Sequence, residues 1–202
     1  MTDEKKIVPK IAIQSIGGGL FLMAFFTMMW NGIAENGFNG SDHYLLTVIF
    51  SIFSLTFIIY GLRFFLVSKK FPKLTTDADK KEGAKLGKWY GIIFGLEGVT
   101  IPLTVYLLLK FNSGNFIIPA IALIVGLHFY PMAKIFKRKI DYYLATWTCI
   151  IALIGIYMTA TNNISESIIF SFIGIGVGIA TSTYGFYMVH IGYLYTKSLV
   201  KI

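Results

Sequence analysis

The chain has 202 residues, of which 55% are hydrophobic, 16% are aromatic and only 14% are charged, and its mean hydropathy is +0.69. This composition has too little polar surface for an ordinary water-soluble domain, so that class is excluded. A net charge of +8 is also typical of nucleic-acid-binding proteins, but here the basic residues cluster at the ends of apolar stretches. We therefore predict no nucleic-acid partner.

Six stretches reach the length of about 20 apolar residues that a membrane-spanning helix needs. They cover about residues 11–31, 44–67, 89–109, 116–133, 142–160 and 168–195. A cleaved signal peptide is the alternative for the first stretch, because Lys5 and Lys6 precede it. That stretch exceeds the usual 7–15 residues of a signal sequence, so we keep it as a span. We predict an all-α fold, a polytopic integral membrane bundle of six transmembrane helices in one domain.

The basic residues predict the orientation of the bundle. Of the 18 Lys and Arg residues, all except Lys110 lie on the side of the termini, the connector 68–86 and the connector after the fourth span. The positive-inside rule assigns this side to the cytoplasm, with both termini there, in a plasma membrane. The lysines of connector 68–86 could bind anionic lipids. The interpretation that we favour is that they are ordinary determinants of topology.

Local signals in the third and fourth spans add detail. Thr75, Thr76 or Asp77 is expected to cap a helix that begins well before residue 89. Pro102 and Pro119 lie inside the third and fourth spans, where each should free a carbonyl one turn earlier. Transporters use such broken helices to build binding sites, although proline kinks are also routine in membrane helices.

Glycines recur at helical spacing in two of the spans. They are Gly87, Gly91 and Gly95 in the third span and Gly174, Gly178, Gly185 and Gly192 in the sixth. Small residues at this spacing let helix backbones approach closely in lipid. We predict that both faces pack within the chain and that the third and sixth helices are central. A homodimer interface is the alternative.

Ionisable residues at membrane depth are the candidate functional residues, because a charge among acyl chains is costly. Glu97 lies eight residues beyond Trp89, roughly 12 Å into the membrane at the helical rise per residue. The same measure places Arg63, His128 and His190 at similar depth, with Thr148 on the fifth span. These five residues are predicted to form one polar layer.

Our hypothesis is that Glu97 pairs with Arg63, or hydrogen-bonds to His128 or His190, at the centre of the bundle. Such a group could relay protons or bind a cation or substrate. The structural alternative is that Arg63 extends toward the interface while both histidines and Glu97 only hold helices together. Glu35, Asp42 and Glu166 on the other side could attract cations, but three scattered acids more often have no such role.

Motifs for enzymes and metals are missing from the sequence. No HExxH, GxSxG, P-loop or CxxC pattern is present, and Cys149 is the one cysteine. Glu97 and His128 alone fall short of the three or four ligands that a metal site needs. We predict no metal, no cofactor and no disulfide, and the motifs give no ground for an enzyme.

One segment resembles a known family. Residues 126–134 read GLHFYPMAK, which is similar to a GLHF-x-P-hydrophobic-A signature in small bacterial multi-pass membrane proteins of unknown function. The resemblance covers about nine residues and the six-span layout, and it implies no activity. In it, His128 and Pro131 are the positions that match the motif.

Three functions are compatible with these observations. The first, which we favour, is a small proton- or cation-coupled transporter or channel-like protein that uses the layer around Glu97. The second is a non-catalytic scaffold, immunity protein or partner-binding protein. The third is an intramembrane enzyme that acts on a lipid, against which the lack of paired acids argues. Transport predicts a cavity that reaches Glu97, a scaffold predicts a dry bundle, and an enzyme predicts a groove open sideways to lipid.

Overall fold

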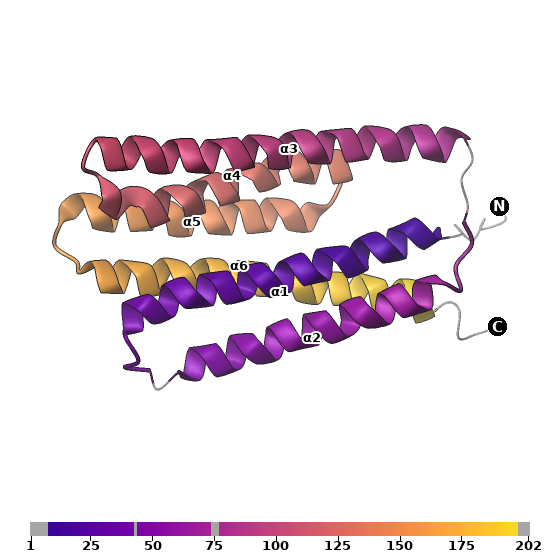
Figure 1. The fold of residues 1–202 in the computed structure, drawn as a ribbon, viewed down its shortest axis with the longest axis horizontal. Helices are drawn as coiled ribbons and strands as arrows, with labels where there is room; N and C mark the ends of the chain where they lie inside the picture. Colours follow the sequence, from indigo (N-terminus) through magenta and orange to yellow (C-terminus); the bar gives the residue numbers. More distant parts are fainter. Residues whose placement is uncertain (1–7, 43, 74–76, 198–202) are drawn as a thin grey trace.

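The computed structural model describes residues 8–42, 44–73 and 77–197, and in these ranges it contains helices and no strand (Figure 1). The helices are α1 (Lys10–Phe38), α2 (Leu45–Ser68), α3 (Asp77–Lys110), α4 (Ile117–Phe136), α5 (Lys139–Thr161) and α6 (Glu166–Lys197), and the 3₁₀ turn η1 (Gly114–Phe116) precedes α4. By length and composition, all six helices could cross a membrane. The predicted all-α fold with six spans is therefore confirmed.

The ends of the helices follow from local chemistry. Thr75 and Thr76 lie outside the described residues, and α3 begins at Asp77, well before the predicted span, as expected. Asn39 and Asn162, which follow α1 and α5, adopt φ values of 50° and 51°. Asparagine tolerates this left-handed conformation, in which its backbone N–H bonds back to the last turn and ends the helix.

The helices form two groups of three (Figure 1). α1, α2 and α6 pack together on one side, and α4 packs along α5 and α3 on the other. α6 contacts α1, α2, α4 and α5, so its predicted central position is correct. α3 packs along α4 and borders η1 at the edge of the bundle, so the prediction of a central third helix is wrong.

Three glycines on α6, spaced by seven residues, pack against three phenylalanine rings of α2. The contacts pair Gly178 with Phe50, Gly185 with Phe57, and Gly192 with Phe64, and the three rings are 3%, 0% and 0% exposed. Seven residues are about two helical turns, so both rows stay on one face of their helix. Gly174 meets the backbone of Ala34 on α1 instead. The glycines of the sixth span therefore pack within the chain, as predicted.

The glycines of the third span behave differently. A Cβ atom added at Gly87, Gly91 or Gly95 would meet no heavy atom within 4 Å. All three positions are exposed, because α3 turns a different face toward α4. The prediction that these glycines pack within the chain is wrong, and the homodimer alternative stays a prediction.

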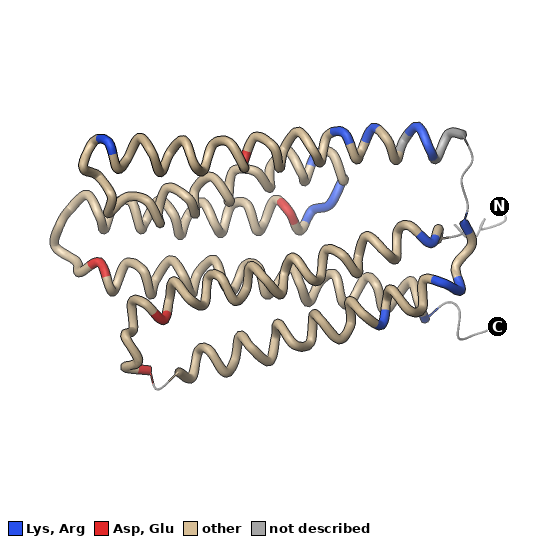
Figure 2. Tube along the Cα trace, in the orientation of Figure 1, with Lys and Arg blue, Asp and Glu red and all other residues tan. Residues whose placement is uncertain are grey.

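Basic residues concentrate toward one end of the bundle (Figure 2). Among the described residues, Lys and Arg gather at the end where α1 begins and α6 ends, and Lys110 lies at the other end, where α3 finishes. Lys5, Lys6 and Lys201 lie outside the described residues. We call the end where α1 begins and α6 ends the Lys-rich end.

Two of the three acids at the opposite end have structural roles. Glu35 Oε1 accepts hydrogen bonds from Thr47 N–H (3.2 Å) and Thr47 Oγ1 (2.8 Å), which tie α1 to α2. The carboxylate of Asp42 accepts from the backbone N–H groups of Tyr44 and Leu46 and so caps the start of α2. These contacts favour the structural interpretation over a cation-attracting mouth.

Candidate functional site

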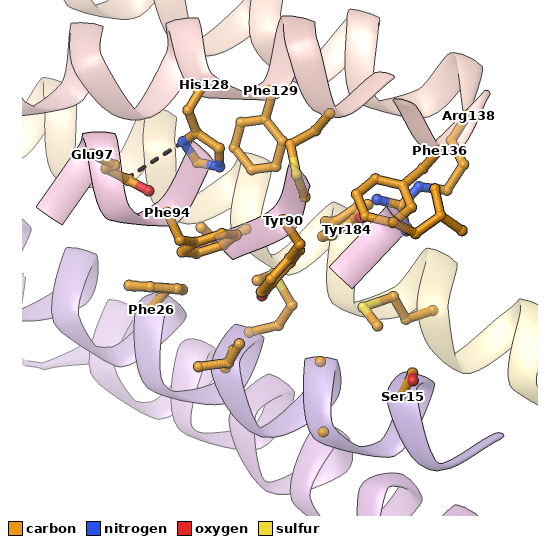
Figure 3. A pocket seen from close by; sticks show the side chains of 18 of the residues that line it. Ser15, Phe26, Tyr90, Phe94, Glu97, His128, Phe129, Phe136, Arg138 and Tyr184 are labelled. Carbon is orange, nitrogen blue, oxygen red and sulfur yellow. Dashed lines mark ion pairs between the residues drawn. The ribbon is translucent and has the colours of Figure 1, made fainter. Parts of the chain in front are cut away.

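A cavity of about 700 Å³ lies between α1, α3, α4 and α6 (Figure 3). Its walls are mostly apolar and aromatic, with a few polar groups that include Glu97, His128, Arg138 and Tyr184. This volume lies within the range of small-molecule binding sites, and an apolar wall with few polar groups is their usual composition. We call this space the α1–α3 cavity.

The α1–α3 cavity opens on the surface of the bundle between the two helices for which it is named. Ser15 and Leu22 of α1 line it, as do Gly87 and Tyr90 of α3, and all four are exposed. These residues lie within apolar stretches that could cross a membrane. The opening therefore faces sideways, away from both ends of the bundle, along part of the length of the helices.

Glu97 and His128 form an ion-pair contact in the wall of the cavity. Oε1 of Glu97 lies 3.4 Å from Nδ1 of His128, and the two side chains are 13% and 11% exposed. The contact joins α3 to α4. These two helices run antiparallel on either side of η1, which lets residues 97 and 128 face each other (Figure 1). Nδ1 of His128 makes no hydrogen bond of standard geometry. The pair is thus close enough to share a proton after a small adjustment.

Aromatic rings connect this pair with the Lys-rich end. The ring of Phe94 lies 5.6 Å from His128 and 4.3 Å from Tyr90, measured between centroids. Tyr90 in turn lies 6.3 Å from Phe136. Tyr90, Phe94 and Glu97 are spaced by four and three residues, which places them on one face of α3. That face forms one wall of the cavity.

A second charged pair lies next to Phe136, at the far end of these aromatic rings from Glu97. The sequence analysis did not identify this pair. Nε of Arg138 lies 3.0 Å from Oδ2 of Asp141, which is fully buried. The guanidinium also lies over the rings of Phe136 and Tyr184, at 4.7 and 5.4 Å from their centroids. The three-residue spacing of Arg138 and Asp141 at the start of a span was the signal that could have revealed the pair.

The predicted polar layer forms only in part, because the structure brings together just two of its five residues. Arg63 is exposed on α2, with its guanidinium 5.8 Å from the ring of Tyr60, so its predicted pairing with Glu97 is wrong. His190 is exposed on α6 and does not line the cavity. Equal depth did not bring these residues together, because α2 packs on α1 and α6, away from α3.

Thr148, the fifth residue of the predicted layer, lies in the interface between α4 and α5. It is fully buried, and its backbone lies against Gly126 where α5 packs on α4. It does not line the cavity. Its predicted membership of the layer with Glu97 is wrong, because its side chain belongs to a helix interface.

The prolines differ from expectation as well. α3 continues as a helix through Pro102, so no unwound segment forms beside Glu97. Pro119 is the third residue of α4, where a helix has no acceptor for a backbone N–H, so it frees no carbonyl. The proline inside α4 is Pro131, one turn after Leu127 and three residues after the contact residue His128.

The chemistry available here is proton exchange and recognition of charge. A carboxyl and an imidazole in contact can hold a proton between them and release it when a ligand changes their surroundings. Across the described ranges, no three His, Cys, Asp or Glu side chains gather closely enough to hold a metal ion. The resemblance of residues 126–134 to the GLHFxP-type family stays a prediction. No protein-family model, curated protein or solved structure matches this chain.

Proposed function

We propose that the protein is a small membrane transporter that binds its ligand in the α1–α3 cavity and couples this binding to protonation at Glu97 and His128. One observation carries the proposal: a cavity large enough for a small molecule reaches two ionisable side chains in contact within the apolar part of the bundle. Ionisable groups in such a position usually line a substrate or proton pathway.

The cavity also favours a transporter over a non-catalytic scaffold. A bundle held together by polar contacts alone would bury Glu97 in a dry interface with its carboxylate fully bonded. Here Glu97 lines an open space, and Nδ1 of His128 lacks a hydrogen-bond partner of standard geometry. Both features support a site that accepts a ligand or water.

Orientation and location belong to the proposal as well. We place the Lys-rich end, and with it both termini, in the cytoplasm of a bacterial cell, with the six helices across the plasma membrane. The concentration of Lys and Arg at this end supports this orientation (Figure 2). The exposed lysines of this end would contact anionic lipid headgroups.

The test is a flux assay with the purified full chain in liposomes that enclose a pH-sensitive dye. A hydrophobic cation, a hydrophobic anion and a neutral amphiphile are added in turn. We expect at least one of them to cause a proton flux that requires the protein. The flux should be lost in Glu97→Gln and retained in Glu166→Gln, the same chemical change in the first turn of α6 and outside the cavity.

Two results would overturn the proposal. One is an equal flux with Glu97→Gln and with the unmodified protein, because the carboxyl would then play no part. The other is that none of the three probes causes a flux above that of empty liposomes, while the protein is folded as judged by its thermal unfolding.

A second candidate function comes from the sideways opening of the cavity. Lipids could enter between α1 and α3 and meet Glu97 and His128 as a general acid and base. The hydroxyls of Ser15 and Thr181 line the cavity, but they donate to the carbonyls of Ile11 and Gly178 in their own helices and not to this pair, which would not activate them as nucleophiles. Mass spectrometry of lipids incubated with the protein would test this function, which predicts a product that disappears in His128→Gln.

A further inference from the structure

The charge of the α1–α3 cavity depends on the protonation of the Glu97–His128 pair. The ionisable side chains that line it are Glu97, His128, Arg138, Tyr90 and Tyr184. Arg138 is already neutralised by Asp141, 3.0 Å away. No lysine among the described residues lines the cavity. Once Glu97 loses its proton and His128 is neutral, the cavity carries one negative charge that no positive charge in the described wall balances.

Aromatic rings surround the space next to this charge. Phe26 from α1 and Phe94 from α3 point into the cavity, and Tyr90 lies one turn of α3 beyond Phe94 (Figure 3). The face of an aromatic ring attracts a cation, and the attraction reaches about 2 kcal/mol or more when water is excluded. A carboxylate together with ring faces therefore favours positively charged ligands.

The remaining wall is apolar and can adapt its shape. Met23, Met29, Met132 and Met188 line the cavity from three helices. Methionine side chains are unbranched and polarisable, so they fit themselves to ligands of different shape. The cavity is also open to lipid between α1 and α3, which suits a ligand that dissolves in the membrane.

We propose that the α1–α3 cavity binds lipophilic organic cations, with the positive charge next to Glu97 and the apolar body against the aromatic and methionine side chains. This inference rests on the proposed transport function and names its substrate class. Arrival of the cation would displace the proton of Glu97, so that one positive charge replaces another in the apolar part of the bundle.

The choice of a cation over an anion or a lipid tail follows from charge complementarity. An anion would meet the Glu97 carboxylate and find no free positive group in the described wall, since Arg138 is paired. An acyl chain would fit the apolar wall and leave the charge of the carboxylate without a positive counterpart, which is costly in an apolar medium. A cation satisfies both the charge and the rings.

The experiment compares two ions of almost the same shape and opposite charge. Tetraphenylphosphonium and tetraphenylborate are titrated by calorimetry into the full chain in lipid nanodiscs, with empty nanodiscs as the blank. We expect the phosphonium to bind saturably, with one site per chain, and the borate to bind no more than it does to the blank. The binding heat should vary between buffers of different ionisation enthalpy, because a proton is released.

Variants identify the site. Glu97→Gln should weaken phosphonium binding at least tenfold, whereas Glu166→Gln should leave it unchanged. Phe94→Leu, which removes a ring and keeps an apolar side chain, should weaken it several-fold while the thermal unfolding temperature stays close to that of the parent. Phe94→Leu keeps the test decisive if Glu97→Gln does not fold.

Three results would overturn the inference. They are equal or stronger binding of the borate, phosphonium binding no greater than that to empty nanodiscs, and unchanged phosphonium binding in both Glu97→Gln and Phe94→Leu. If an anion or a neutral amphiphile still drives a proton flux that requires Glu97, the cation class is wrong and the proposed transport function stands. If no probe drives a flux, the transport function itself is wrong.

Discussion

The ring of Phe57 on α2 lies directly against the backbone of Gly185 on α6, and it is fully buried there. A methyl group at residue 185 would overlap this buried ring, so the ring or a helix would have to shift. We therefore expect Gly185→Ala to lower the free energy of unfolding by about 1–3 kcal/mol, the range for overpacked cores. Thermal unfolding in detergent measures this change. Gly91→Ala, where a Cβ meets nothing within 4 Å, is the control and should change stability by less than about 1 kcal/mol.

Gly87 allows the cavity to be filled without disturbing the bundle. It lines the cavity, and a side chain there would enter open space. Gly87→Leu should lower the affinity for tetraphenylphosphonium about tenfold and leave the unfolding temperature nearly unchanged. Gly91→Leu lies on the same helix outside the cavity and should bind the ion normally. Equal binding by both variants would show that the ion occupies some other site.

The buried carboxylate of Asp141 should contribute to stability through Arg138. Asp141→Asn leaves the shape of the side chain and removes the charge opposite the guanidinium. Because Arg138 is 28% exposed and stays partly solvated, we expect a loss of about 2 kcal/mol, within the range for hydrogen bonds to charged groups. Chemical unfolding measures it. If the pair is the cause, the change should be much smaller when it is made in an Arg138→Gln background.

Thr47 connects α2 to two residues of α1. Its hydroxyl donates to Glu35 Oε1 at 2.8 Å and accepts from Nδ2 of Asn31 at 2.9 Å. Thr47→Val keeps the shape and removes both bonds, so we expect a loss of about 1–3 kcal/mol from the unsatisfied groups. Ligand-driven proton flux should survive in the folded fraction, because these residues lie outside the cavity. A loss of flux at full stability would place Glu35 in the transport pathway after all.

The spans could be predicted because hydropathy is a property of each stretch by itself. The position of α3 could not be predicted. A glycine face that packs on a neighbour and one that faces lipid have the same spacing, and Gly91 and Gly185 differ only in what the rest of the chain places beside them.

The candidate site was predictable to a similar, partial degree. Depth follows from the rise per residue, so Glu97 and His128 were correctly placed at one level, and they meet. The direction in which a side chain points around its helix, and which helices are neighbours, depend on packing of the whole bundle. Arg63 was therefore an equal candidate in the sequence and lies elsewhere in the structure.

The peripheral position of α3 has a consequence for how the bundle assembles. Only 6% of its most apolar stretch is buried, compared with 61% for α6, while its mean hydropathy of 2.0 exceeds the 1.6 of α6. In a two-step view of membrane folding, helices first insert independently and then associate. α3 must rely mainly on the first step. A polar substitution on its outer face should therefore impair insertion by the translocation machinery, whereas a comparable change in α6 would leave an inserted helix that fails to associate.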